Sequence, residues 1–111
     1  MNIEEFKKYS HEVVDWMYEY FKEIETYKIK PDTHPGKIYN LLPKKPPSEG
    51  ESFDKILDDF NKIIMPGITH WQSPNFYAFF PANNSYPSVI AEMLTATLGA
   101  QCMMWDTSPA A

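Results

Sequence analysis

The sequence predicts a mainly α-helical chain in which three helices are joined by extended, proline-rich segments. Apolar residues recur at helical spacing in three separate stretches, and a typical helix-capping residue precedes each stretch. Most of the ten prolines fall between these stretches, where they prevent a helix from continuing. Because 111 residues form one small domain at most, a single modest core is expected.

The first helix is predicted over residues 3–26. Asn2 can cap this helix, and Glu5 stands at the spacing of a capping box. The apolar face is wider than that of an ordinary amphipathic helix, because a second set of large side chains flanks the main row. The main row is Phe6, Val13, Met17, Tyr20 and Ile24, and the flanking set is Tyr9, Val14, Trp16 and Phe21.

Residues 27–52 are predicted to be an ordered, extended crossing segment. Prolines and glycines interrupt it throughout, whereas Ile38, Leu41 and Leu42 are apolar anchors that need a surface to rest on. A second helix is predicted over residues 53–64. Ser52 is its expected N-cap, and the sequence Met-Pro-Gly that follows is its expected end.

An aromatic loop is predicted over residues 66–84. Prolines prevent regular structure in this loop, and five large rings fall within ten residues: Trp71, Phe76, Tyr77, Phe79 and Phe80. Loops normally run over the surface, so these rings must cover or line something. Two interpretations stay open, a plug between the helices or the wall of a pocket for a flat apolar ligand.

The third helix is predicted to start at Ser85, with Pro87 in its first turn, and to end at Gly99. The apolar run of residues 100–105 is predicted to be strand-like or extended. Ser108 followed by Pro109 is a further helix-start signal with no helix after it. This signal favours a chain that is the first part of a longer, truncated protein.

Composition excludes several functional classes. The net charge is −5 and the basic residues are all lysine, so a nucleic-acid-binding patch is not expected. No apolar run is long enough for a membrane span, and the first residues lack the apolar region of a signal peptide, so a cytoplasmic protein is expected.

Metal and thiol chemistry are also disfavoured. The three histidines and the one cysteine do not stand at metal-ligand spacing, so no metal site is predicted. Cys102 lies in an apolar run and is expected to be a buried, inert thiol. His70 is expected to be a hydrogen-bonded loop residue, with a role in a site as the alternative. No catalytic residue is predicted in this chain.

Three nearby stretches resemble a known protein family. They are Ile-Met-Pro-Gly-Ile-Thr-His-Trp-Gln-Ser-Pro-Asn-Phe over residues 64–76, then Phe79-Phe80-Pro81, then Ser85-Tyr86-Pro87. They resemble the N-terminal portion of the aromatic-L-amino-acid decarboxylases, which are group II pyridoxal-phosphate decarboxylases. The resemblance implies an α/β parent enzyme of fold type I, PLP-dependent transferase-like, that forms a homodimer. Residues 1–84 would be an N-terminal dimerisation flap, and residues 85–111 would begin the large cofactor domain. The partner subunit would then cover the wide face of the first helix.

The same resemblance implies pyridoxal 5'-phosphate as the cofactor. The lysine, aspartate and histidine that hold it would lie beyond this chain, so the chain alone is expected to be inactive. What the chain can supply is substrate binding, at the positions that match the family's ring pocket and at those that reach the pocket of the partner subunit. The first group is Trp71, Phe79, Phe80, Pro81 and Ala82, and the second is Gln101 and Met103.

Four of these positions differ from the pattern of the animal DOPA decarboxylases. Ala82 stands in place of a threonine, Phe79 of a tyrosine, Gln101 of an isoleucine and Met103 of a phenylalanine. The first two differences remove hydroxyls, so a catechol substrate is disfavoured. An unsubstituted ring or an indole is expected instead, and Gln101 leaves a non-aromatic amino acid open.

The predicted function is therefore the dimerising and substrate-lining segment of a pyridoxal-phosphate-dependent L-amino-acid decarboxylase, a carboxy-lyase. An aromatic amino acid is the expected substrate. An oxidative variant of the reaction stays open. The alternative is a free-standing helical protein-interaction module without catalysis.

Overall fold

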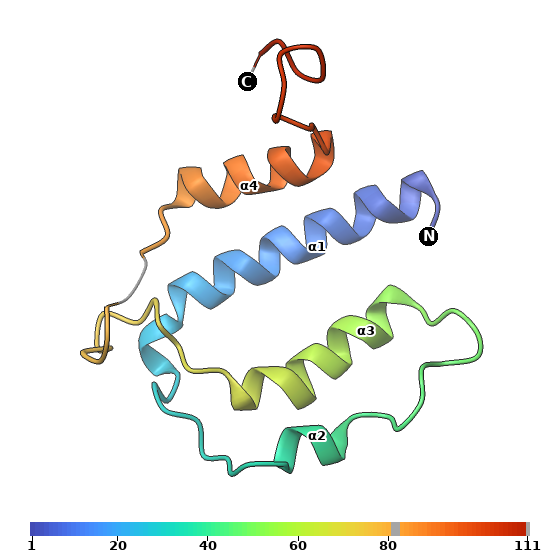
Figure 1. Ribbon diagram of the computed structural model, residues 1–111. Coiled ribbons are helices and arrows are strands. Elements are labelled where there is room, and N and C mark those ends of the chain that lie inside the picture. Colours follow the sequence, from blue (N-terminus) through green and yellow to red (C-terminus); the bar gives the residue numbers. More distant parts are fainter. Residues whose placement is uncertain (81–82, 111) are drawn as a thin grey trace. The chain divides into compact units, whose positions relative to one another are not determined.

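The computed structural model describes residues 1–80 and 83–110, and within them the chain is helical, with no strand (Figure 1). The chain divides into two compact units, residues 1–79 and residues 80–111. The helical class predicted from the sequence is confirmed. For residues 100–105, predicted to be strand-like or extended, the strand-like alternative is wrong, because no strand forms and residues 103–105 are in bends and a turn.

The first unit begins with α1, which spans Ile3–Lys22. The predicted capping box is present, since Asn2 Oδ1 accepts the Glu5 N–H at 2.8 Å and the Glu5 carboxylate accepts the Asn2 N–H at 2.7 Å. A 3₁₀ turn, η1, follows at Ile24–Thr26. Helical structure thus reaches the predicted residue 26, but the last turn is tighter than an α-helix.

The second predicted helix is observed as a series of three helical types. The α-helix α3 spans Phe53–Asp59, and the Ser52 side chain caps it by accepting the Lys55 N–H. A π-helical turn, η2, continues over Phe60–Ile64, and a 3₁₀ turn, η3, over Met65–Gly67. The Met-Pro-Gly sequence therefore adds one more turn before the chain leaves the helix.

The helices α1 and α3 run side by side in the same direction (Figure 1). Tyr9 donates from its hydroxyl to Asp54 at 2.7 Å, and Trp16 Nε1 donates to Asn61 Oδ1 at 2.8 Å. Both bonds join residues 45 positions apart, which requires the two helices to be parallel. The Phe60 ring adds an edge-on contact with Trp16, at 5.5 Å between centroids.

The parallel arrangement explains the crossing segment. The chain must return from the end of α1 to a point near its beginning before α3 can start, and residues 27–52 make this return. The prediction missed a short helix in it, α2, at Lys37–Leu41. Its presence corrects the expected number of α-helices, because the stretch between Gly36 and Pro43 contains no proline and leaves room for one turn.

One apolar anchor of the crossing segment rests on the end of the second helical series. A Cβ added to Gly67 would lie 3.0 Å from Cδ1 of Ile38, so the Ile38 side chain packs against the Gly67 backbone in space that a larger residue would fill. Leu41 and Leu42 remain exposed. Ile38 is thus the anchor that finds its surface within this chain.

The second unit contains α4, which spans Tyr86–Leu98. Ser85 caps its start through a hydrogen bond from the Ser88 N–H, and Gly99 ends it with a φ of +57°. These bounds confirm the third predicted helix. Its large side chains are mostly exposed, including Ile90 and Leu98.

The core of the chain is much smaller than its apolar content would allow. Among the described residues the only buried hydrophobic side chain is Ile24. Large apolar side chains are exposed in each unit, such as Phe6 at 52% in the first and Leu98 at 76% in the second. Many apolar side chains therefore lack a covering surface within this chain.

Candidate functional site

His70 and Ser73 are the two buried polar residues of the described chain, and both lie in the aromatic loop. Nδ1 of His70 lies 3.0 Å from the Tyr20 hydroxyl oxygen, and the His70 backbone N–H donates to the Ile29 carbonyl at 3.3 Å. The imidazole also faces the Tyr27 ring, at 4.6 Å between centroids. The prediction of a hydrogen-bonded loop residue is confirmed, and this half of the loop is a plug against the first helix.

Burial determines the charge states of this pair. Burial lowers the pKa of His70, because a charged imidazole would lose its hydration. Burial also raises the pKa of Tyr20, and the neighbouring Tyr27 adds to this increase. Both groups are therefore neutral near pH 7, so the bond between them joins two uncharged partners.

Consecutive tight turns carry the loop away from this anchor. The Ser73 N–H donates to the His70 carbonyl at 3.1 Å, and the Phe76 N–H donates to the Ser73 carbonyl at 3.0 Å. The Ser73 hydroxyl accepts the Asn75 N–H at 3.3 Å. These bonds fix the backbone on both sides of Trp71.

Three rings gather on the outer side of these turns. Trp71 lies 4.9 Å from Phe76 and 5.7 Å from Phe79 between centroids, and it is nearly parallel to Phe79 at 19°. Trp71 is 42% exposed and Phe79 is 80% exposed. We call Trp71, Phe76 and Phe79 the ring cluster. It presents aromatic faces outward, as the wall of a ligand pocket would.

Phe79 has an unusual backbone conformation. Its φ is +59°, and it is the one non-glycine residue with a positive φ among those described. This left-handed conformation costs about 1–2 kcal/mol for a residue with a Cβ. Strained residues of this kind cluster at binding and catalytic sites, which supports a role for this position.

The remaining predicted site residues lie in the second unit or outside the described residues. Phe80, Gln101 and Met103 are exposed and belong to the second unit. Pro81 and Ala82 lie outside the described residues. Phe76 joins the ring cluster, although the resemblance did not place it in the pocket. Its short spacing from Trp71 in the sequence is the signal that could have predicted this contact.

The prediction for Cys102 is wrong, since its thiol is exposed. The prediction rested on the apolar run in which this residue lies, since apolar runs favour burial. The run instead forms bends with its large side chains, such as Met104 and Trp105, facing outward.

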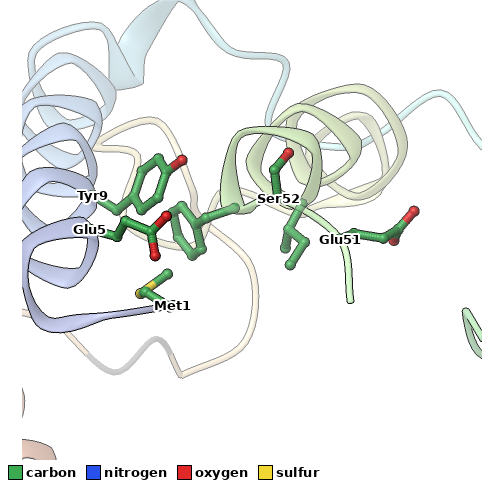
Figure 2. Close-up of a pocket in the computed structure, with 7 residues that line it drawn as sticks. Met1, Glu5, Tyr9, Glu51 and Ser52 are labelled. Carbon is green, nitrogen blue, oxygen red and sulfur yellow. The ribbon is translucent and has the colours of Figure 1, made fainter. Parts of the chain in front are cut away.

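A cavity of about 250 Å³ lies between the first turns of α1 and α3. Figure 2 shows Glu5 and Tyr9 extending from α1 toward α3, while Glu51 points away from them. Each polar group has a partner: Glu5 caps α1, Tyr9 binds Asp54, and Glu51 pairs with Lys55 at 2.9 Å. The cavity is a packing gap remote from the ring cluster, and nothing in it points to a ligand.

Residues 35–111 match the family model described as the pyridoxal-dependent decarboxylase conserved domain. The chain belongs to the pyridoxal-dependent decarboxylase family. It is 44% identical over 110 residues to aromatic-L-amino-acid decarboxylase of Bos taurus, a match that covers 99% of this chain and 23% of the bovine protein. It is 42% identical over 111 residues to phenylacetaldehyde synthase of Arabidopsis thaliana, covering 100% of this chain and 23% of that protein.

Solved structures agree with these relatives of the decarboxylase family. The crystal structure of Catharanthus roseus tryptophan decarboxylase in complex with L-tryptophan aligns with a TM-score of 0.92 and 41% identity, covering 99% of this chain and 24% of that one. The resemblance to the aromatic-L-amino-acid decarboxylases is thus confirmed over nearly the whole chain. The chain spans about a quarter of the length of these relatives.

All ten lysines are exposed, and the aromatic loop contains none. No group of three or more metal-binding side chains occurs in the described parts of the chain. Within residues 1–80 and 83–110 no helix has the length and apolar character to cross a membrane.

Proposed function

We propose that this chain is the substrate-lining and dimerising segment of a pyridoxal-phosphate-dependent L-amino-acid decarboxylase that acts on an aromatic amino acid. The observation that carries the proposal is the ring cluster, which is exposed on one side and fixed by buried turns on the other. Pyridoxal phosphate, held by residues outside this chain, supplies the electron sink for loss of the carboxyl group.

The task of the ring cluster is to bind and orient the substrate's side chain. Aromatic rings offer a large apolar contact area with few torsions to freeze, and they favour offset stacking with a flat ligand. Trp71 and Phe79 lie close to parallel, so a third ring can stack against their exposed edge or face. Holding the substrate's ring here fixes the direction in which its carboxyl group leaves.

The chemistry of the cluster favours a ring without hydroxyl groups. None of Trp71, Phe76 and Phe79 carries a hydroxyl, and the Trp71 indole N–H is the one polar group of the three side chains, so they offer little specific hydrogen bonding to a catechol. Phenylalanine or tryptophan is therefore the proposed substrate. The complex of the Catharanthus roseus enzyme with L-tryptophan supports an indole.

The dimerising role is proposed from the uncovered apolar surface. Ile3, Phe6 and Val14 are exposed on α1, and Ile90 and Leu98 are exposed on α4. Exposed apolar area of this extent marks an interaction surface. We assign part of this surface to contact with the second subunit of a homodimer and part to contact with the rest of the same subunit. The large domain of that subunit would be of fold type I.

A chimera tests this function. This chain replaces the matching segment of the bovine aromatic-L-amino-acid decarboxylase, and carbon dioxide release is measured with phenylalanine, tryptophan and a catechol amino acid. The expected chimera is an active dimer that prefers the first two substrates. A folded, cofactor-loaded chimera that releases no carbon dioxide from any of them would contradict the proposal.

A matched pair of variants tests whether the ring cluster itself binds the substrate. Trp71→Ala removes a ring of the cluster and is expected to raise KM for the aromatic substrate at least tenfold. Tyr77→Ala removes a ring that lies in the same loop but outside the cluster and is 90% exposed, so KM should change less than twofold. Equal effects of the two changes would argue against a specific ring site.

A further inference from the structure

We infer that His70 is a positioning residue for the substrate's ring, acting by tying the loop that carries Trp71 to α1 through the Tyr20 hydroxyl. The inference rests on the proposed function, because it concerns the same ring cluster. His70 does not face the ligand side itself. It is 4% exposed and contacts Tyr20 and Tyr27, whereas the adjacent Trp71 is 42% exposed and contacts Phe76 and Phe79.

His70 connects the loop to the rest of the first unit at more than one point. Its side chain bonds to Tyr20 of α1, and its backbone N–H bonds to Ile29 of the crossing segment. Its carbonyl accepts the Ser73 N–H and so starts the turns that lead to the ring cluster. A shift of His70 would therefore move the backbone of Trp71, which follows it directly.

The anchor on the other side of this bond is rigid. The Tyr20 ring is stacked on Trp16, with 5.4 Å between centroids and an interplanar angle of 4°. Trp16 in turn donates to Asn61 of η2. The contacts of Trp16, Tyr20 and His70 thus fix the position of the loop relative to α1 and η2.

This arrangement differs from simple filling of space. A residue that only filled the gap would need volume, and an apolar side chain of similar size would replace it. A positioning residue needs the polar atom at Nδ1, which the Tyr20 hydroxyl meets at 3.0 Å. Asparagine places a polar atom close to the position of Nδ1, whereas leucine keeps bulk and loses the bond.

The test uses the chimera described above with His70→Leu, His70→Asn and Tyr20→Phe. His70→Leu is expected to raise KM about fivefold to tenfold with kcat changed less than twofold, since one part-buried, neutral hydrogen bond positions the loop. His70→Asn should recover most of this loss. Tyr20→Phe, which removes only the hydroxyl, should raise KM about threefold. His34→Leu, at an exposed histidine of the crossing segment, is the control and should leave both constants unchanged.

Hydrogen exchange of the loop peptide, residues 70–79, gives a second readout that does not depend on turnover. The Ser73 and Phe76 amides should exchange faster in His70→Leu and in Tyr20→Phe than in the unaltered chimera. In the control variant His34→Leu they should exchange at the rate of the unaltered chimera. The inference is overturned if kcat falls as much as KM rises, if asparagine rescues no better than leucine, or if loop exchange is unchanged. An inactive chimera would count against the proposed function, and loop exchange would still decide the role of His70.

Discussion

The buried imidazole of His70 makes the stability of the first unit depend on pH. Its pKa lies below the ordinary value of 6.5 because burial disfavours the charged ring. The Tyr20 and Tyr27 rings face it, and Lys28 and Asp32 line the neighbouring cavity. At pH 7 and above, this histidine is neutral in both the folded and the unfolded chain, so its protonation does not lower the free energy of unfolding.

We predict that the free energy of unfolding falls as the pH is lowered through 6.5 toward the depressed pKa of His70. In that window the unfolded chain binds a proton that the folded chain does not, so the loss is at most about 1.4 kcal/mol per pH unit. Urea unfolding at pH 7.5 and 5.5 measures it. His70→Asn should remove this part of the pH dependence, and an unaltered slope in that variant would assign it to other groups.

At the scale of elements, the contact between α2 and η3 requires glycine at position 67. A Cβ there would meet two atoms of Ile38, Cδ1 and Cγ1, each at 3.0 Å. The short helix α2 therefore depends on a residue that the sequence presents as a helix terminator. This contact adds to the hydrogen bond between the His70 N–H and the Ile29 carbonyl, which joins the start of the crossing segment to the aromatic loop.

We predict that Gly67→Ala lowers the free energy of unfolding by about 1 kcal/mol, because Ile38 must shift to admit the methyl group. The matched control is Gly50→Ala, where an added Cβ meets nothing within 4 Å and φ is not positive. That change should be neutral or slightly stabilising. Urea unfolding of both variants checks the pair, and equal effects would show that close packing at position 67 is unimportant.

Helix existence was predictable for three elements because each carries its own signals. Asn2, Ser52 and Ser85 cap their helices by contacts within the same few residues, which the sequence alone reveals. The short α2 was missed because five residues give too little periodicity to recognise. The π-helical turn at η2 was missed because it depends on packing and not on a local residue signal.

At the scale of the whole molecule, the exposed apolar surface determines behaviour in solution. Within the first unit alone, Ile3, Phe6 and Val14 of α1 are exposed. Burying such surface is the main favourable term in association. The chain by itself is therefore expected to associate.

We predict a dimer or a larger assembly of this chain at micromolar concentration, measured by sedimentation or light scattering. Phe6→Ser, which removes an exposed ring from α1, should weaken association. Lys7→Ser, at the neighbouring exposed position, should not weaken it. A well-behaved monomer of the unaltered chain would contradict the proposed dimerising role of α1.

The sequence by itself determined the helical class, the three capped helices and the membership of the decarboxylase family, because these depend on local periodicity and on a specific run of residues in the aromatic loop. It also identified Trp71 and Phe79 as candidate site residues. The tertiary structure decided that Phe76 joins them, that His70 lies buried behind them, and that α1 and α3 are parallel. The burial of His70 and the parallel helices depend on contacts between residues 45 to 50 positions apart, such as Trp16 with Asn61 and Tyr20 with His70, and no local pattern encodes such pairs. The contact of Phe76 with Trp71 is local, and it depends on the tight turns that fold the loop between them.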